Sequence, residues 1–314
     1  MTTYIIGHQK PDTDAVVSAL AYEYLAKQLD WLGHQNPQAV ITDPLNPETS
    51  YLFDKLHLET PRLIRADDLN QNDEVVLVDH NEENQRLPNL DQNKIVKIID
   101  HHKVNLNFNR PIFLNFKPWG STATIIYFLM KTFEIKPDQT LATLMLAAIL
   151  SDTVGFKSAT TTEKDQELAK ELASIANIND LNAFTLEIFK AKSDLSELDD
   201  YQVATNDYKI FDFGGKKVFV NQVETVEQAE IIANRKPALI EALAKVKQEM
   251  KVDLAFLAVS DILNVNTKII VAGKEEAQVA EKAFGEQVIN QVIDIGPKLS
   301  RKKEIAPALE KVIS

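Results

Sequence analysis

Four apolar segments of this chain each run into aspartate or histidine residues, which are side chains that can bind metal ions. The four junctions are Ile6 into the sequence GHQKPDTD at 7–14, Val78 into Asp79, Ile99 into Asp100-His101-His102, and Leu150 into Ser151-Asp152. The strands of a parallel sheet end at one shared edge, where the sites of α/β proteins lie. The pattern therefore predicts that these carboxylates and imidazoles meet at one place.

Strand-like and helix-like segments alternate between these junctions. Apolar residues at helical spacing predict helices over 15–29, 47–56, 121–133, 140–150 and 165–176, and a further short strand is predicted at 39–41. Alternation of this kind predicts a mainly parallel sheet covered by helices. We assign residues 1–189 to this α/β domain.

A different pattern follows a polar segment at 190–200, which we interpret as a linker, or as a linker and the start of a connecting helix. Strands predicted over 207–213 and 217–223 flank Gly214-Gly215, a strong β-hairpin signal. Further strands are predicted over 254–259 and 267–272, and helices over 229–251, 275–284 and 306–312. Residues 201–314 are therefore predicted to form a smaller α/β domain with a mixed sheet.

Composition excludes several classes of protein. The 314 residues include no cysteine, which removes disulfides, zinc–thiolate sites and cysteine nucleophiles. A net charge of -12 argues against general nucleic-acid binding, which depends on Lys and Arg. The apolar stretches are too short to cross a bilayer, and the N-terminus lacks the pattern of a secretory signal. We expect a cytoplasmic protein without membrane or nucleic-acid partners.

Metal-ligand side chains at the junctions form one set: His8, Asp12, Asp14, Asp79, His101 and Asp152. They offer nitrogen and oxygen without sulfur, which suits Mn²⁺, Fe²⁺, Co²⁺ or Zn²⁺ better than Ca²⁺. Six ligands are too many for one open site and fit two ions about 3.5–4 Å apart that activate a shared water. Its central place in the chain makes Asp79 the best candidate to bridge two ions.

A simpler interpretation applies to each aspartate alone, because a lone aspartate at a strand end is usually a helix cap. The histidines argue for the metal site, since four of the six fall at the junctions: His8, His80, His101 and His102. We interpret His80 as a structural or supporting residue, and His34 and His57 as surface or packing residues.

The second domain ends in a basic sequence, Ser300-Arg301-Lys302-Lys303. Arginine binds phosphate through two parallel hydrogen bonds, and lysine adds a compact positive charge. A solvated basic turn is the alternative. The acidic first domain has no comparable basic cluster, so the pattern favours a phosphate clamp. The segment 120–124 could offer helix N-terminal N–H groups to an anion, or could be an ordinary cap.

In order, the motifs GHQKPDTD, VDHNE, DHH and SDT resemble those of the DHH phosphoesterase superfamily. The set is most similar to family II, the manganese-dependent inorganic pyrophosphatases. The resemblance extends over the whole chain, because SRKK at 300–303 is similar to the substrate-binding signature of that family's C-terminal, DHHA2-like domain. One departure is Lys10, where many members carry Asn.

The resemblance implies a role for each matching residue. One Mn²⁺ would be held by His8, Asp12 and Asp79, and the other by Asp14, Asp79, His101 and Asp152. Co²⁺ could replace Mn²⁺ at the same ligands. The implied substrate contacts are His102, Lys209, Arg301 and Lys302, with His102 as the donor of a hydrogen bond or proton.

The implied reaction is hydrolysis of inorganic pyrophosphate to two orthophosphates between the two domains. A water bridging the two metal ions would be the nucleophile, an additional Mg²⁺ would arrive with the substrate, and the linker would serve as a hinge. The family also implies a homodimer.

Three rivals stay open at this point. An exopolyphosphatase of the same superfamily shares both domains. A DHH-type nuclease or cyclic-dinucleotide phosphodiesterase typically carries a Gly-Gly-Gly-His-type motif in its second domain, whereas here no histidine follows His102. A non-catalytic metal-dependent binding protein would need a metal site without an open position.

Overall fold

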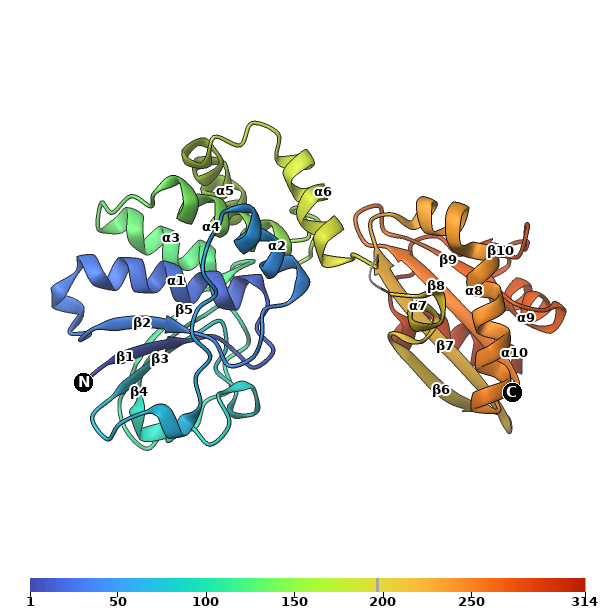
Figure 1. Ribbon diagram of the computed structural model, residues 1–314, viewed down its shortest axis with the longest axis horizontal. Coiled ribbons are helices and arrows are strands. Elements are labelled where there is room, and N and C mark those ends of the chain that lie inside the picture. Colours follow the sequence, from blue (N-terminus) through green and yellow to red (C-terminus); the bar gives the residue numbers. More distant parts are fainter. Residues whose placement is uncertain (196–197, 314) are drawn as a thin grey trace. The chain divides into compact units, whose positions relative to one another are not determined.

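The computed structural model describes residues 1–195 and 198–313 and divides the chain into two compact units, Met1–Lys192 and Ser193–Ser314 (Figure 1). The division falls inside the segment 190–200. Residues 196–197 of the predicted linker and residue 314 of the predicted second domain lie outside the described residues. In the described part of the chain, no helix is long and apolar enough to span a bilayer.

A five-stranded parallel sheet with the order β2-β1-β3-β4-β5 forms the centre of the first unit. Its strands are β1 (Thr3–Ile6), β2 (Pro37–Val40), β3 (Glu74–Val78), β4 (Ile95–Asp100) and β5 (Phe113–Phe116). Buried, almost continuously apolar strands are typical of parallel sheets that are covered on both faces. The predicted parallel sheet is confirmed, while the short strand β5 was not predicted.

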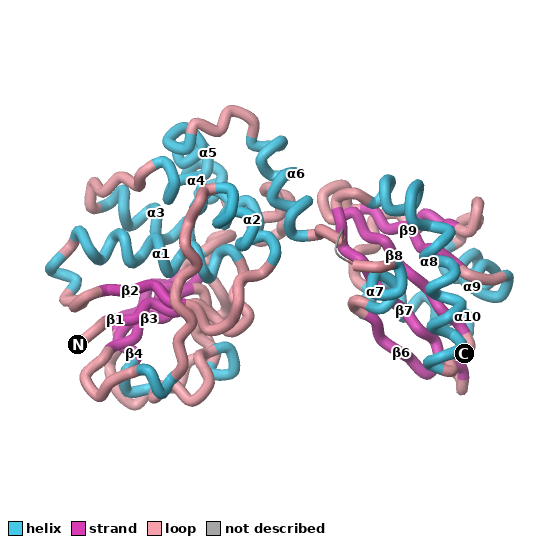
Figure 2. Tube along the Cα trace, viewed as in Figure 1, coloured by secondary structure: helices cyan, strands magenta, loops and turns pink. Residues whose placement is uncertain are grey.

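Helices cover one face of this sheet (Figures 1 and 2). They are α1 (Thr13–Gln28), α2 (Pro47–Lys55), α3 (Thr122–Thr132), α4 (Gln139–Asp152), α5 (Glu163–Ala176) and α6 (Leu181–Lys192). The other face packs against loop residues such as Leu87, Leu106 and Phe108. That loop-covered side includes 3₁₀ turns at Ala66–Asp68, Glu83–Gln85 and Gln92–Lys94, and another 3₁₀ turn, Asp30–Leu32, follows α1.

The strand order of the first sheet fixes where a ligand can bind. Strand β1 has β2 as its neighbour on one side and β3 as its neighbour on the other, so the direction in which the chain adds strands to the sheet reverses at β1. Ligands of open α/β sheets bind in the crevice at such a reversal, outside the carboxyl ends of the strands. The segments that follow β1 and β3 carry the first two predicted motifs, so the topology brings them to this crevice.

In the second unit a mixed sheet has the order β10-β9-β8-β7-β6, in which only β7 and β8 pair in parallel among the described strands. Its strands are β6 (Tyr208–Phe213), β7 (Lys216–Thr225), β8 (Leu254–Asp261), β9 (Asn266–Val271) and β10 (Val292–Asp294). Gly214 and Gly215 join β6 to β7 with φ of 59° and 87°. Positive φ at both residues is what a two-residue hairpin turn requires. The predicted mixed sheet is confirmed.

The helices of the second unit are α7 (Asp200–Thr205), α8 (Gln228–Met250), α9 (Lys274–Phe284) and α10 (Ala306–Ile313), with a π-helical turn at Arg301–Ile305. Helices α7 and α8 pack on one face of the sheet, and α9 and α10 pack on the other. Each unit therefore has its own hydrophobic core.

Both ends of the segment 190–200 belong to helices. Residues 190–192 complete helix α6, which was not predicted, and α7 begins at Asp200. The Arg235 side chain on α8 donates hydrogen bonds to the Asp200 carboxylate and to the backbone oxygens of Leu195 and Leu198. Arg235 thereby ties the end of the linker to the second unit.

Candidate metal centre

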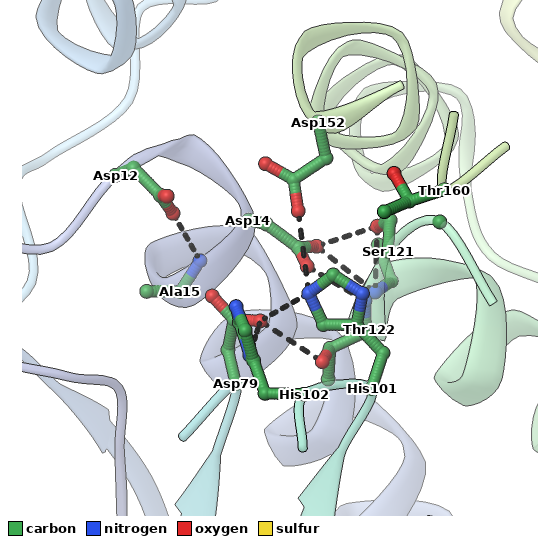
Figure 3. Close-up of polar contacts among 12 residues, drawn as sticks. Asp12, Asp14, Ala15, Asp79, His101, His102, Ser121, Thr122, Asp152 and Thr160 are labelled. Atoms are coloured by element: carbon green, nitrogen blue, oxygen red, sulfur yellow. Dashed lines mark hydrogen bonds and ion pairs between the residues drawn. The ribbon is translucent and has the colours of Figure 1, made fainter. Parts of the chain in front are cut away.

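The predicted ligand residues come together at the crevice of the first unit. Three groups have ligand atoms within 4.8 Å of one another: His8, Asp12 and Asp79; Asp14, Asp79, His101 and Asp152; and Asp79, His101 and His102. We call these seven residues the Asp79 cluster. Figure 3 shows side chains from several segments converging on the same volume. Asp79 belongs to all three groups, in agreement with the central place expected for it.

The first motif turns sharply from β1 into α1. Gly7 lies so close to this helix that a Cβ there would be 2.8 Å from the Ala15 Cβ, which only glycine avoids. Asp12 caps α1 and accepts a hydrogen bond from the Ala15 backbone N–H at 3.0 Å. Asp12 is therefore both a helix cap and a member of the Asp79 cluster, so the two interpretations of this residue do not exclude each other.

Asp79 has a left-handed backbone conformation, with φ of 62°, directly after β3. Aspartate tolerates this region better than most residues, but such conformations are typical of functional sites that hold them in place. The Asp79 carboxylate lies 3.6 Å from His8 Nε2 and 3.3 Å from His101 Nε2. The turn thus aims one buried carboxylate between two imidazoles.

Asp152 reaches the cluster in a different way from the other aspartates. The shared strand edge does not account for Asp152, which is the last residue of helix α4, where a helix over 140–150 was predicted. Its carboxylate lies 3.6 Å from His101 Nε2. Helix α4 packs against α1 and α5 on the helical face of the sheet. Packing of helices, rather than the shared strand edge, therefore positions this residue.

Asp14 is held by the N-terminus of α3. The backbone N–H groups of Thr122 and Ala123 donate to its carboxylate at 2.6 and 2.9 Å, and the hydroxyls of Ser121 and Ser18 donate at 2.8 and 3.2 Å. Helix N-termini favour negative charge. This end of the helix binds the protein's own carboxylate, so the suggestion that segment 120–124 offers these N–H groups to an external anion is wrong.

Supporting contacts fix the rest of the cluster. Thr122 donates its hydroxyl hydrogen to Asp79 at 3.0 Å (Figure 3). His101 Nδ1 lies 2.9 Å from the Trp119 backbone oxygen, which directs Nε2 toward the cluster. Sequence reasoning missed these partners. The Ser-Thr helix cap at 121–122 was the available signal, but nothing in the sequence showed that it faces Asp79.

His102 differs from the other cluster residues because it is exposed. Its side chain is 51% exposed, and its Nδ1 lies 2.9 Å from the buried Asp100 carboxylate. The Asn81 amide donates to the other oxygen of Asp100 at 2.6 Å. This chain of contacts orients His102 while leaving much of its ring accessible.

His80 is buried and does not belong to the three ligand groups. Its Nδ1 lies 2.8 Å from the Val78 backbone oxygen, and its ring meets the ring of His8 edge to face at 6.4 Å. Burial lowers the pKa of His80 to about 4, which keeps the ring neutral. The interpretation of His80 as a supporting residue agrees with this position.

The charges of the cluster favour the binding of a cation. Burial, together with the charges of Asp14 and Asp12, raises the pKa of Asp79 well above its ordinary value, and the same causes raise the pKa of Asp152. Burial alone would lower the pKa of His8, but Asp12 raises it above the ordinary value. The crowded carboxylates thus repel one another, and a bound cation would relieve that repulsion.

Two buried atoms of the cluster also lack a hydrogen-bond partner. They are Asp79 Oδ2 and His101 Nε2. Buried polar atoms are nearly always paired, so an unpaired acceptor in a cluster of acids needs a reason. Divalent cations with oxygen and nitrogen ligands provide one, and the residues present therefore fit manganese.

The predicted substrate cations lie in the second unit. Lys209 is an exposed residue of β6, Lys302 is exposed in the π-helical turn, and Arg301 begins that turn. Arg301 is not free: it donates to the Asp207 carboxylate at 2.9 Å and to the Asp207 backbone oxygen. Because Asp207 directly precedes β6, this contact holds Arg301 near the strand that carries Lys209.

Comparison with known proteins places both units in described families. Residues 2–149 match the DHH family, N-terminal domain, and residues 186–312 match the DHHA2 domain. Fold and site together define a two-domain DHH protein with an Asp- and His-rich centre in its first domain.

Relatives at full length narrow this class. The manganese-dependent inorganic pyrophosphatase of Methanocaldococcus jannaschii is 38% identical over 98% of this chain and 98% of its own length. That of Bacillus subtilis is 37% identical over 97% and 96%. A crystal structure from Methanococcus jannaschii, described as a candidate family II inorganic pyrophosphatase, is 35% identical, covers 99% of both chains and has a TM-score of 0.63. The chain belongs to the manganese-dependent inorganic pyrophosphatase family, which confirms the resemblance.

Proposed function

We propose that this protein hydrolyses inorganic pyrophosphate to two orthophosphates with manganese at the Asp79 cluster. The Asp79 cluster carries the proposal, because it gathers buried carboxylates and imidazoles at a ligand-binding crevice. The names of the full-length relatives support the same activity.

Two ions are proposed for the cluster. His8, Asp12 and Asp79 would hold one, and the other would be held by the second ligand group, Asp14, Asp79, His101 and Asp152. Bound there, a pair of ions would make a water nucleophilic at neutral pH and polarise the attacked phosphoryl group. Co²⁺ could occupy the same ligands, and an additional Mg²⁺ is proposed to accompany the substrate.

The protein's own residues would then position pyrophosphate and neutralise its charge. The turn at Asp79 and the Thr122 hydroxyl hold this carboxylate in its central place among the proposed ligands. Half-exposed His102, oriented by Asp100, would give a hydrogen bond or proton to a leaving oxygen. Arg301, Lys302 and Lys209 are proposed to bind the phosphate that is not attacked.

Domain closure is proposed to bring these cations to the substrate. The segment 190–200 would act as the hinge between the catalytic domain 1–189 and the substrate-binding domain 201–314. Because Arg235 ties Leu195, Leu198 and Asp200 to α8, we expect the bending to occur before Leu195. Closure would also exclude water from the reacting groups.

A cytoplasmic homodimer is the proposed form of the protein. Strand β5 is an edge strand of the first sheet, and its residues Phe113 and Leu114 are exposed. An exposed apolar edge strand is suited to pairing with a second strand. Sedimentation velocity would test this assembly, and a monomer at micromolar concentration would refute it.

Phosphate release by the Mn²⁺-loaded protein tests the proposed function. Pyrophosphate, tripolyphosphate, long-chain polyphosphate and a short RNA dinucleotide should be compared in parallel. We expect a strong preference for pyrophosphate. A preference for long polyphosphate would instead identify an exopolyphosphatase, and hydrolysis of the dinucleotide would identify a phosphodiesterase. An Asp79→Asn variant controls for contaminating phosphatase.

A further inference from the structure

Gln222 places a side-chain amide in the buried part of the second sheet. It lies on β7, which pairs with both β6 and β8, and it is only 7% exposed. Val218 and Val220, which share its face of the strand, are apolar and completely buried. A buried amide costs free energy unless hydrogen bonds offset the loss of water. The partners of Gln222 therefore indicate its role.

The Gln222 amide uses its oxygen and both of its hydrogens. Its Nε2 donates to the Leu299 backbone oxygen at 2.7 Å and to the Ser260 hydroxyl oxygen at 3.1 Å. Its Oε1 accepts the backbone N–H of Arg301 at 3.2 Å. A flipped amide would set oxygen against the Leu299 carbonyl and hydrogens against the Arg301 N–H. The three contacts therefore fix the orientation of the amide.

A row of buried polar groups supports Gln222 from behind. Ser260 on β8 and Thr267 on β9 are paired in register and completely buried, and the Thr267 hydroxyl donates to the Ser260 hydroxyl oxygen at 2.8 Å. The row crosses three neighbouring strands and ends at the backbone of the loop 299–301. Buried polar networks whose members are all partnered make their surroundings rigid.

The loop held by Gln222 begins the basic sequence 300–303. Because Leu299 and Arg301 flank Ser300, the two contacts fix the backbone on both sides of that residue. Arg301 also starts the π-helical turn, a local geometry that is frequent at functional sites. The sheet therefore determines where the basic sequence leaves the fold.

Arg301 is held differently at its two ends. Its backbone N–H is bound by the buried Gln222 amide, whereas its guanidinium donates to the carboxylate of Asp207, whose side chain is 64% exposed. A guanidinium binds phosphate as readily as it binds carboxylate, so a phosphate can take the place of Asp207. The guanidinium can thus exchange partners while the backbone of Arg301 keeps its position.

We propose that Gln222 is a positioning residue for the proposed reaction. Its amide holds the backbone at 299–301 in the place from which Arg301 and Lys302 reach the phosphate that is not attacked. The inference rests on the proposed function, because it concerns the cations that were assigned to the substrate. Binding groups must be aligned closely to be effective, and a displacement of about 1 Å can lower a rate by about a hundredfold.

Gln222→Met tests the proposal, since methionine has a similar length but makes none of the three hydrogen bonds. KM for pyrophosphate should rise about tenfold in the Mn²⁺-loaded variant, as expected for loss of a buried hydrogen-bonding amide. Mn²⁺ affinity should not change, because the Asp79 cluster lies in the other unit. Hydrogen exchange at the Arg301 backbone amide should become faster, and this measurement does not depend on activity.

Gln228→Met is the matched control. Gln228 is also a buried glutamine of the second unit, and its Nε2 donates to the backbone oxygens of Val259 and Asn266 at 2.8 and 3.1 Å. Both variants should lower Tm, because both lose buried hydrogen bonds. Only Gln222→Met should raise KM and speed exchange at Arg301, which a merely structural role would not do.

The outcomes separate the inference from the proposed function. An active wild-type protein with unchanged KM in Gln222→Met, or with an equal rise of KM in both variants, would overturn the inference alone. A wild-type protein that does not hydrolyse pyrophosphate would refute the proposed function, and the inference with it. Should Gln222→Met fail to fold, Ser260→Ala removes one of the three contacts. That variant should raise KM about two- to threefold, and an unchanged KM would again contradict the inference.

Discussion

The two units hold their charged groups in opposite ways. In the first unit, Asp14 and Asp79 are completely buried and receive hydrogen bonds from the start of helix α3. In the second unit, Lys209 and Lys302 are exposed, and Arg301 is held mainly by Asp207, whose side chain is 64% exposed. The first unit therefore holds its charged side chains in fixed positions before any ligand binds, whereas the charged side chains of the second unit can adjust their positions.

This contrast follows from what each set of charges is proposed to bind. Metal ligands must stay within a few tenths of an ångström of their ideal positions, which requires supporting contacts. Like charges crowded together also repel one another unless the ion is present. Cations that bind a mobile phosphate tolerate looser positions, and an exposed lysine costs little free energy to hold. Substitutions in the first unit should therefore impair metal binding, whereas substitutions in the second unit should impair catalysis without loss of metal.

The largest effect is expected from Asp79→Asn. The amide keeps the shape of the side chain but removes the charge at the centre of the cluster, so hydrolysis should fall to background and Mn²⁺ affinity should fall with it. Phosphate release and calorimetric Mn²⁺ titration would check both. Full activity in this variant would show that the proposed site is wrong.

Arg301→Ala should reduce kcat/KM about a hundredfold, since it removes a charge that is proposed to offset the developing phosphate charge. Mn²⁺ binding should be unchanged, because the proposed ligands lie in the other unit. The matched control is Lys311→Ala, an exposed lysine of α10 outside the basic sequence 300–303, which should retain nearly full activity. If the Arg301 variant lost its metal, the division of labour between the units would be disproved.

Thr122→Val should weaken Mn²⁺ binding about tenfold, because partners that orient metal ligands typically contribute that much. The hydroxyl that donates to Asp79 would be lost with little change in volume. Thr122→Ser retains the hydroxyl and should bind Mn²⁺ nearly normally. Competition with a fluorescent chelator would measure both. Equal loss in the two variants would mean that packing, not the hydrogen bond, matters here.

The smallest effect is expected from Asp207→Ala. Its contact with Arg301 is exposed, so its removal should raise KM for pyrophosphate only about two- to fivefold, with kcat and metal binding unchanged. Steady-state kinetics would detect this beside Glu310→Ala as a surface control. A loss as large as that of Arg301→Ala would show that the second unit is as tightly organised as the first.

Most of the cluster could be predicted from sequence, because the side chains after β1, β3 and β4 follow recognisable apolar strands. The basis for including Asp152 was incomplete, since it comes from a helix whose position depends on packing against α1 and α5. The partners of Asp14 could not be predicted at all. Ser121 and Thr122 are more than a hundred residues from Asp14, and a helix cap in the sequence does not reveal what its free N–H groups face.

Parts of the fold escaped prediction for similar reasons. Strand β5 is only four residues long, and Asn115 interrupts its short apolar run. Helix α6 follows an ordinary amphipathic pattern but merges into a polar segment that resembles a linker. Lys97 can be recognised in the sequence as a charged residue within the apolar run 95–99. Only the folded structure shows that Tyr22, His34 and Phe113 surround it.

The position of the Asp79 cluster along the chain has a consequence for biosynthesis. Its residues lie between positions 8 and 152, within the unit that ends at Lys192, whereas β6, with Lys209, begins only at Tyr208. Domains generally fold as units during synthesis, with the N-terminal one first. The nascent chain can therefore assemble the proposed manganese ligands while the proposed phosphate clamp at 300–303 is still untranslated. Metal loading would then be complete before the protein is able to consume its substrate.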